Sequence, residues 1–147
     1  MEVLESILAL IVTLSILVTI HEFGHYWVAR RCGVKVLRFS VGFGFPLLKK
    51  KFGRDQTEWV IAAFPFGGYV KMLDEREGEV AQTERTRAFN NQPVGSRIAI
   101  VVAGPLFNFV FAIFFYWMMF ASGVPGLRPV VGDVRSEEHT YELQSPD

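Results

Sequence analysis

The stretch "LVTIHEFGHYWVARR", residues 17–31, joins an apolar run to a cluster of ionisable side chains. Residues 21–25 fit the pattern His-Glu-x-x-His, which is typical of zinc hydrolases. On an α-helix, positions i and i+4 are about 40° apart around the axis, so His21 and His25 share a face and can hold one zinc ion. Glu22 can reach a water molecule at the metal without binding the metal itself. We therefore expect a zinc site at the two histidines and a general base at Glu22.

Two parts of the sequence are free of charged residues, namely residues 6–20 and 98–122. The second exceeds the roughly 20 residues that a transmembrane helix needs, and the first reaches that length if it continues through the motif to Ala29. Ionisable groups inside a membrane segment are costly and therefore usually functional. The pattern predicts a mainly α-helical membrane protein, with transmembrane helices at 1–31 and 98–122 and a loop at 32–97.

The basic residues indicate an orientation in the membrane, since 13 of the 15 Lys and Arg residues lie between positions 30 and 97. Basic loops stay in the cytoplasm, so the loop should be cytoplasmic and both ends of the chain should lie outside. Glu2 and Glu5, with no Lys or Arg beside them, argue against a cleaved signal peptide. Acidic residues also number 15. We expect the lipid bilayer, and no nucleic acid, as a partner.

The loop between the helices has the composition of β-structure. Val and Phe content favours a strand from residue 34 to 41, and Gly42 and Gly44 favour either a turn or a kink in the strand. Lys49, Lys50 and Lys51 mark a hairpin tip that either touches anionic lipid or is only solvated. Residues 58–72 predict a re-entrant hairpin that dips toward the membrane. Its edge could bind a substrate by β-addition; the alternative is an ordinary buried hairpin.

Three segments together resemble the site-2 protease family of intramembrane zinc metalloproteases: HEFGH at 21–25, FPFGGYVKM at 64–72 and AGPLFNFVFA at 103–112. The resemblance covers about residues 2–134. It implies that His21 and His25 bind zinc and that Glu22 is catalytic. It also implies that Gly67, Gly68 and Tyr69 belong to a re-entrant β-loop that engages substrate, and that Asn108 lies near the active site. Asn108 is a lone amide in a lipid-length helix, so it should face the protein interior.

The resemblance also implies partners and a location. Such proteases lie in the bacterial inner membrane, cut a membrane-spanning anti-sigma factor and clear remnant signal peptides. Their substrates are therefore transmembrane helices. Residues 123–134 resemble the start of a periplasmic PDZ domain. The polar residues 135–147 no longer resemble the family.

One expected element is missing from this sequence. The family's third zinc ligand is an Asp in a Leu-Asp-Gly motif, and no such motif occurs among the 147 residues. We therefore expect residues 1–147 alone to bind zinc weakly and to lack activity. Two other functions stay open: a non-catalytic membrane protein that binds partners, and a metal carrier. Glu22 discriminates among the three functions, because a hydrolase needs a general base beside the first histidine and a carrier does not.

Overall fold

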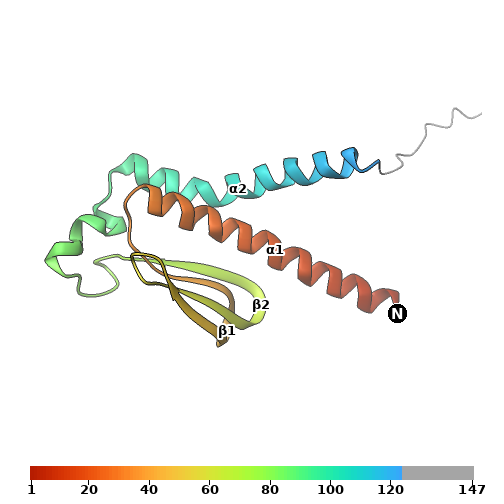
Figure 1. The fold of residues 1–147 in the computed structure, drawn as a ribbon, viewed down its shortest axis with the longest axis horizontal. Coiled ribbons are helices and arrows are strands. Elements are labelled where there is room, and N and C mark those ends of the chain that lie inside the picture. The colour runs from red at the N-terminus through yellow and green to blue at the C-terminus, as the bar shows by residue number, and fades with distance from the viewer. Residues whose placement is uncertain (124–147) are drawn as a thin grey trace, which may run out of the picture.

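The computed structural model describes residues 1–123, which form two long helices and one sheet (Figure 1). Helix α1 spans Glu2–Arg31 and helix α2 spans Val94–Ala121. The two helices run in opposite directions, and α1 lies between α2 and the sheet (Figure 1). The prediction of two long apolar helices separated by a β region is confirmed. The predicted tail, and all but the first residue of the predicted PDZ start, fall in residues 124–147, outside the described part.

Both helices are long and apolar enough to cross a membrane. No residue in the most apolar 18-residue window of α1 is buried, and large side chains of α2 such as Phe109 and Trp117 are about two-thirds exposed. A helix in the core of a soluble protein would bury such side chains, whereas an extended apolar surface marks a contact with lipid or another protein. The surface of these helices therefore suits a hydrocarbon environment.

Helix α2 begins at Val94, four residues before the predicted start at 98. The prediction followed the uncharged run, which begins only after Arg97. A helix needs backbone hydrogen bonds rather than apolar side chains, so its first turn can extend past the apolar segment. Pro93 directly precedes α2, and proline is well suited to the start of a helix because it lacks an N–H to satisfy.

The sheet consists of two long antiparallel strands, β1 at Val36–Phe52 and β2 at Thr57–Met72. Gly42 and Gly44 in β1 have φ angles of 89° and 86°, a region that glycine adopts readily, so the predicted kink is confirmed. Because the strands bend, Ser40 has Cα partners in both Val60 and Tyr69. Residues 68–72 pair with β1 on one side only within residues 1–123. They therefore form an edge of the sheet.

An aromatic cluster attaches the sheet to the end of α1. The ring of Tyr26 lies 5.6 Å from that of Phe39 and 5.1 Å from that of Trp59, and the last two rings are 4.6 Å apart. Edge-to-face and tilted pairs at such distances are worth about 0.5–1.5 kcal/mol each beyond their buried area. Ile100 of α2 is buried in the same core. The last turns of α1 are therefore held from both sides.

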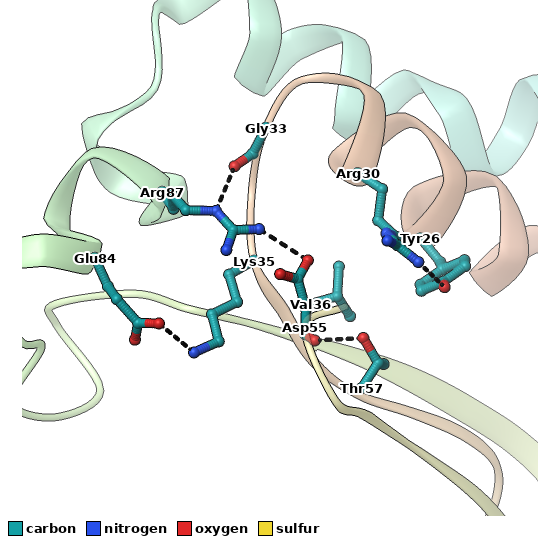
Figure 2. A network of polar contacts seen from close by, with 9 residues as sticks. All are labelled: Tyr26, Arg30, Gly33, Lys35, Val36, Asp55, Thr57, Glu84 and Arg87. Atoms are coloured by element: carbon teal, nitrogen blue, oxygen red, sulfur yellow. Dashed lines mark hydrogen bonds and ion pairs between the residues drawn. The ribbon is translucent and has the colours of Figure 1, made fainter. Parts of the chain in front are cut away.

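The polar segment between β2 and α2, residues 73–93 and here called the linker, contains two short 3-10 helices, at Gln82–Arg87 and Phe89–Asn91. Figure 2 shows how the linker is attached: the Arg87 guanidinium donates to Asp55 at 2.8 Å, and Lys35 pairs with Glu84. The hydrogen bond from Arg87 holds the pKa of Asp55 below its usual value. The linker therefore contacts both the hairpin turn, at Asp55, and the segment that follows α1, at Lys35.

Candidate metal centre and active site

The histidine pair lies on one face of α1, as the spacing predicts. The ring centroids of His21 and His25 are 4.8 Å apart, with the ring planes at 80°. The Nδ1 atom of His25 lies 2.7 Å from the carbonyl oxygen of Ile100 on α2. A carbonyl can only accept a hydrogen bond, so Nδ1 carries the proton and Nε2 keeps its lone pair. A neutral histidine with its proton on Nδ1 can ligate a metal through Nε2.

A glycine on α2 lies directly against both rings. A Cβ atom added at Gly104 would lie 2.7 Å from His21 Nε2 and 2.6 Å from His25 Cε1, with His25 Nε2 closer still. Both rings therefore pack against the backbone of α2, and only glycine lets them come so close. The two Nε2 atoms lie within 2.7 Å of one point. They are therefore close together, and two imidazole nitrogens suit the donor set of a zinc ion.

The helices come close enough for this arrangement because α1 also has a glycine at the contact. A Cβ atom at Gly24 would lie 2.5 Å from the carbonyl oxygen of Ala103 and 3.0 Å from Cβ of Phe107. Small residues let helix backbones approach closely. Gly24 therefore lets the backbone of α2 lie directly beside the motif.

Glu22 points toward the sheet rather than toward α2. A Cβ atom at Gly68 of β2 would lie 3.3 Å from Cγ of Glu22. Further along α1, the hydroxyl of Ser15 donates to the carbonyl oxygen of Pro65 at 2.8 Å. The bend in β2 therefore runs along α1 and reaches the carboxylate. Within residues 1–123, Glu22 forms no hydrogen bond or ion pair, so its oxygens are free to accept a proton.

The other residues predicted for substrate binding divide into two groups. Gly68 lies against Glu22, as described above. Tyr69 instead accepts a hydrogen bond from Arg38 at 3.1 Å, and its ring stacks on Phe43 with centroids 6.2 Å apart. Gly67 lies against the ring of Phe43 with a φ angle of 154°. These contacts position the strand edge, and neither Gly67 nor the Tyr69 side chain contacts the histidines.

Asn108 follows Gly104 by one helical turn and is half-buried on α2. Its Oδ1 atom is buried and has no hydrogen-bond partner among the described residues. A buried acceptor without a partner is unusual, and this oxygen is open to a donor from outside the described residues. The expectation that this amide faces the protein interior agrees with that burial.

Sequence reasoning missed two contributors to the site, Gly104 and the carbonyl of Ile100. Gly104 stood out only as part of the segment AGPLFNFVFA, and a backbone carbonyl has no sequence signature. The periodicity of α2 is the one available signal: positions 100, 104 and 108 are four residues apart and share a face. The structure groups no three His, Cys, Asp or Glu side chains as a possible metal site within residues 1–123.

Known proteins resemble this chain over most of its length. Residues 9–144 match the pattern of peptidase family M50, which extends ten residues past the expected end of the resemblance. The regulator of sigma-E protease RseP of Salmonella typhimurium is 57% identical over 98% of the chain, which covers 32% of that protein. RseP of Escherichia coli K12 is 55% identical over 96% of the chain and 31% of its own length.

A third relative, from Vibrio cholerae, has the name of a zinc metalloprotease; it is 53% identical over 90% of the chain and 29% of its own length. The chain therefore spans about a third of the length of the relatives it matches. The predicted resemblance to the site-2 family of metalloproteases is confirmed. Since the match to the family pattern covers nearly the whole sequence and includes the histidine pair, the chain belongs to peptidase family M50.

Proposed function

We propose that this chain forms part of the active site of a zinc-dependent intramembrane endopeptidase. The observation that carries the proposal is the position of the two imidazoles: His21 and His25 direct their Nε2 atoms to the same point beside Gly104. His21 and His25 would hold the zinc ion through these atoms. Catalytic zinc sites generally have three protein ligands, so the proposal requires a third ligand from outside residues 1–123.

The roles of the chain's own groups rest on the motif and on the contacts with α2. When bound, the zinc ion would lower the pKa of a water molecule and polarise a peptide carbonyl. The Glu22 carboxylate would accept the proton of the attacking water and return it to the nitrogen of the leaving amine; this role rests on the His-Glu-x-x-His spacing, since the Glu22 side chain lies against Gly68 of the sheet. The Ile100 carbonyl keeps His25 in the tautomer that can bind the metal. Gly104 lets both imidazoles lie against α2.

The edge of β2 suggests how a substrate is held. Residues 68–72 are unpaired on one side within the described chain, and the edge begins beside Glu22. A substrate segment that adds to this edge would be extended, with its backbone near the general base. Asn108 offers a buried acceptor for a backbone N–H of the substrate or for a group near the metal. Gly67 and Tyr69 contribute by positioning the strand.

The membrane location and the substrates are part of the same proposal. The helices would cross the bacterial inner membrane with the loop in the cytoplasm and both ends of this chain in the periplasm, as the basic residues indicate. The substrates would then be single-span proteins, with an anti-sigma factor as the first candidate because the relatives are named regulators of sigma-E. Remnant signal peptides are a second kind of substrate with the same chemistry.

The decisive experiment is Glu22→Gln in a full-length protein, meaning this sequence within a protein of the length of its relatives. Zinc should stay bound, because Glu22 is not a ligand, and cleavage of a transmembrane substrate should be lost. Glu5→Gln is the matched control, since Glu5 is exposed in the first turn of α1, and should leave both properties unchanged. Cleavage at the normal rate by Glu22→Gln would remove the hydrolase assignment and favour a metal carrier or a partner-binding protein.

A further inference from the structure

A cavity between α1 and the sheet lies outside the metal site. It has a volume of about 600 Å³ and is lined almost wholly by apolar atoms. Ile20 and Phe23 of α1 form one wall, and Val41, Leu48, Trp59 and Ile61 of the sheet form the other. This size falls within the roughly 300–1,000 Å³ of pockets that hold small molecules. The space is therefore large enough for an apolar chain.

The rim of this cavity carries positive charge. Lys49 and Lys50 line it, and both side chains are exposed. A lysine can lay its aliphatic stem along an apolar wall and direct its ammonium group outward. Neither lysine forms an ion pair with a described residue, and the two acidic residues of the same sheet and its turn have other partners: Glu58 pairs with Arg38, and Asp55 pairs with Arg87.

The strand that carries these lysines changes from apolar to basic along its length. Its apolar end has exposed large side chains at Phe43, Phe45, Leu47 and Leu48, and residues 49–51 follow directly. At about 3.3 Å per residue, the step from Leu47 to Lys50 covers roughly 10 Å. An apolar tip followed by lysines is the arrangement of a segment that enters a bilayer at the level of the lipid headgroups.

We propose that this cavity binds an anionic phospholipid, with an acyl chain between α1 and the sheet and the headgroup phosphate on Lys49 and Lys50. The apolar walls suit an acyl chain, and the two unpaired ammonium groups suit the negative charge of the headgroup phosphate. Phosphatidylglycerol has both features, whereas phosphatidylcholine has the same chains but no net charge. This lipid site is separate from the metal centre, so it stands or falls independently of the proteolytic function.

Trp59 provides a direct probe, because it lines the cavity. The other two tryptophans, Trp27 and Trp117, are replaced by Phe, so that emission reports Trp59 alone. The protein is placed in phosphatidylcholine nanodiscs that contain a small fixed fraction of phospholipid with brominated acyl chains. Brominated phosphatidylglycerol should quench Trp59 more strongly than brominated phosphatidylcholine at the same fraction.

The charge variants test the contact with the headgroup. Lys49→Gln and Lys50→Gln should each lower the preference for phosphatidylglycerol roughly fivefold, the factor expected for one basic residue at an anionic lipid surface. Lys49→Arg and Lys50→Arg should retain the preference and so control for folding. Arg54→Gln is the matched control, because Arg54 is exposed at the hairpin turn and does not line the cavity.

Several outcomes would overturn the proposal. Equal quenching by the two brominated lipids would show that the cavity does not select an anionic headgroup. A loss of preference in Arg54→Gln as large as in the lysine variants would reduce the effect to general surface charge. Release of quenching by inorganic phosphate would show that the charge alone is recognised. Release by one equivalent of a transmembrane peptide would identify the cavity as a peptide groove.

Discussion

Replacement of Gly104 by alanine tests the metal centre directly. The new Cβ atom would lie 2.7 Å from His21 Nε2 and 2.6 Å from His25 Cε1, whereas ordinary contacts begin at 3.4 Å. The rings would therefore have to withdraw by about 0.7 Å (3.4 minus 2.7) and 0.8 Å (3.4 minus 2.6). Metal sites hold their ligand distances to within about 0.2 Å. We expect zinc affinity to fall at least as far as the roughly 10–100-fold loss seen when groups that orient metal ligands are mutated.

The helix itself should not suffer from this change. Alanine favours a helix by about 0.5–1 kcal/mol over glycine, so Gly104→Ala separates metal binding from folding. The assay is zinc affinity, measured by competition with a chromophoric chelator, together with thermal unfolding of the metal-free protein. Gly95→Ala is the matched control, because Gly95 lies on the same helix with no atom within 4 Å of its added Cβ. Wild-type zinc affinity in Gly104→Ala would refute the arrangement in which the Nε2 atoms of both histidines lie against Gly104.

Further variants test the remaining parts of the proposal in the full-length protein. His21→Ala or His25→Ala should abolish cleavage and weaken zinc binding, and normal cleavage by either variant would contradict the ligand assignment. Tyr69→Pro should impair cleavage with zinc still bound, because proline removes a backbone donor from the strand edge; Tyr69→Phe, which loses only the hydroxyl, is its control, and equal rates for the two would count against β-addition. The Asp55–Arg87 pair should add under about 1 kcal/mol to stability. Since the pKa of Asp55 is lowered by the hydrogen bond from Arg87, this contribution is complete above about pH 4 and is lost as the pH falls through the folded-state pKa. Thermal unfolding of Asp55→Asn should show a smaller loss between neutral and acidic pH, and an unchanged pH dependence would remove the pair from the account.

The parts of the fold that sequence could predict are those controlled by local patterns. The shared face of His21 and His25 follows from the helical period alone, and the kink in β1 follows from Gly42 and Gly44, which adopt φ angles that other residues avoid. The two long helices follow from uncharged runs of sufficient length. Each of these features depends on residues that are close in sequence.

The parts that sequence could not predict depend on contacts between distant segments. His25 and Ile100 are 75 residues apart, and a carbonyl oxygen is present at every position, so no pattern distinguishes the one that orients the imidazole. The 3-10 helices of the linker likewise follow from tertiary pairing, through Arg87 and Asp55, rather than from the charged composition. A segment with charges of both signs is expected to be a solvated loop unless the residues that pair with it are known.

Two glycines, one on each helix, allow the close contact between α1 and α2 at the metal site. Gly24 lets the backbone of α2 approach α1, and this approach places the Ile100 carbonyl 2.7 Å from His25 Nδ1. Gly104 lets the rings of both histidines pack against α2. If the helices moved apart, the hydrogen bond that fixes the His25 tautomer would lengthen and its hold on the ring would weaken. The motif on α1 is therefore an incomplete description of the metal site: α2 sets the orientation of one ligand and the surface against which both rings lie.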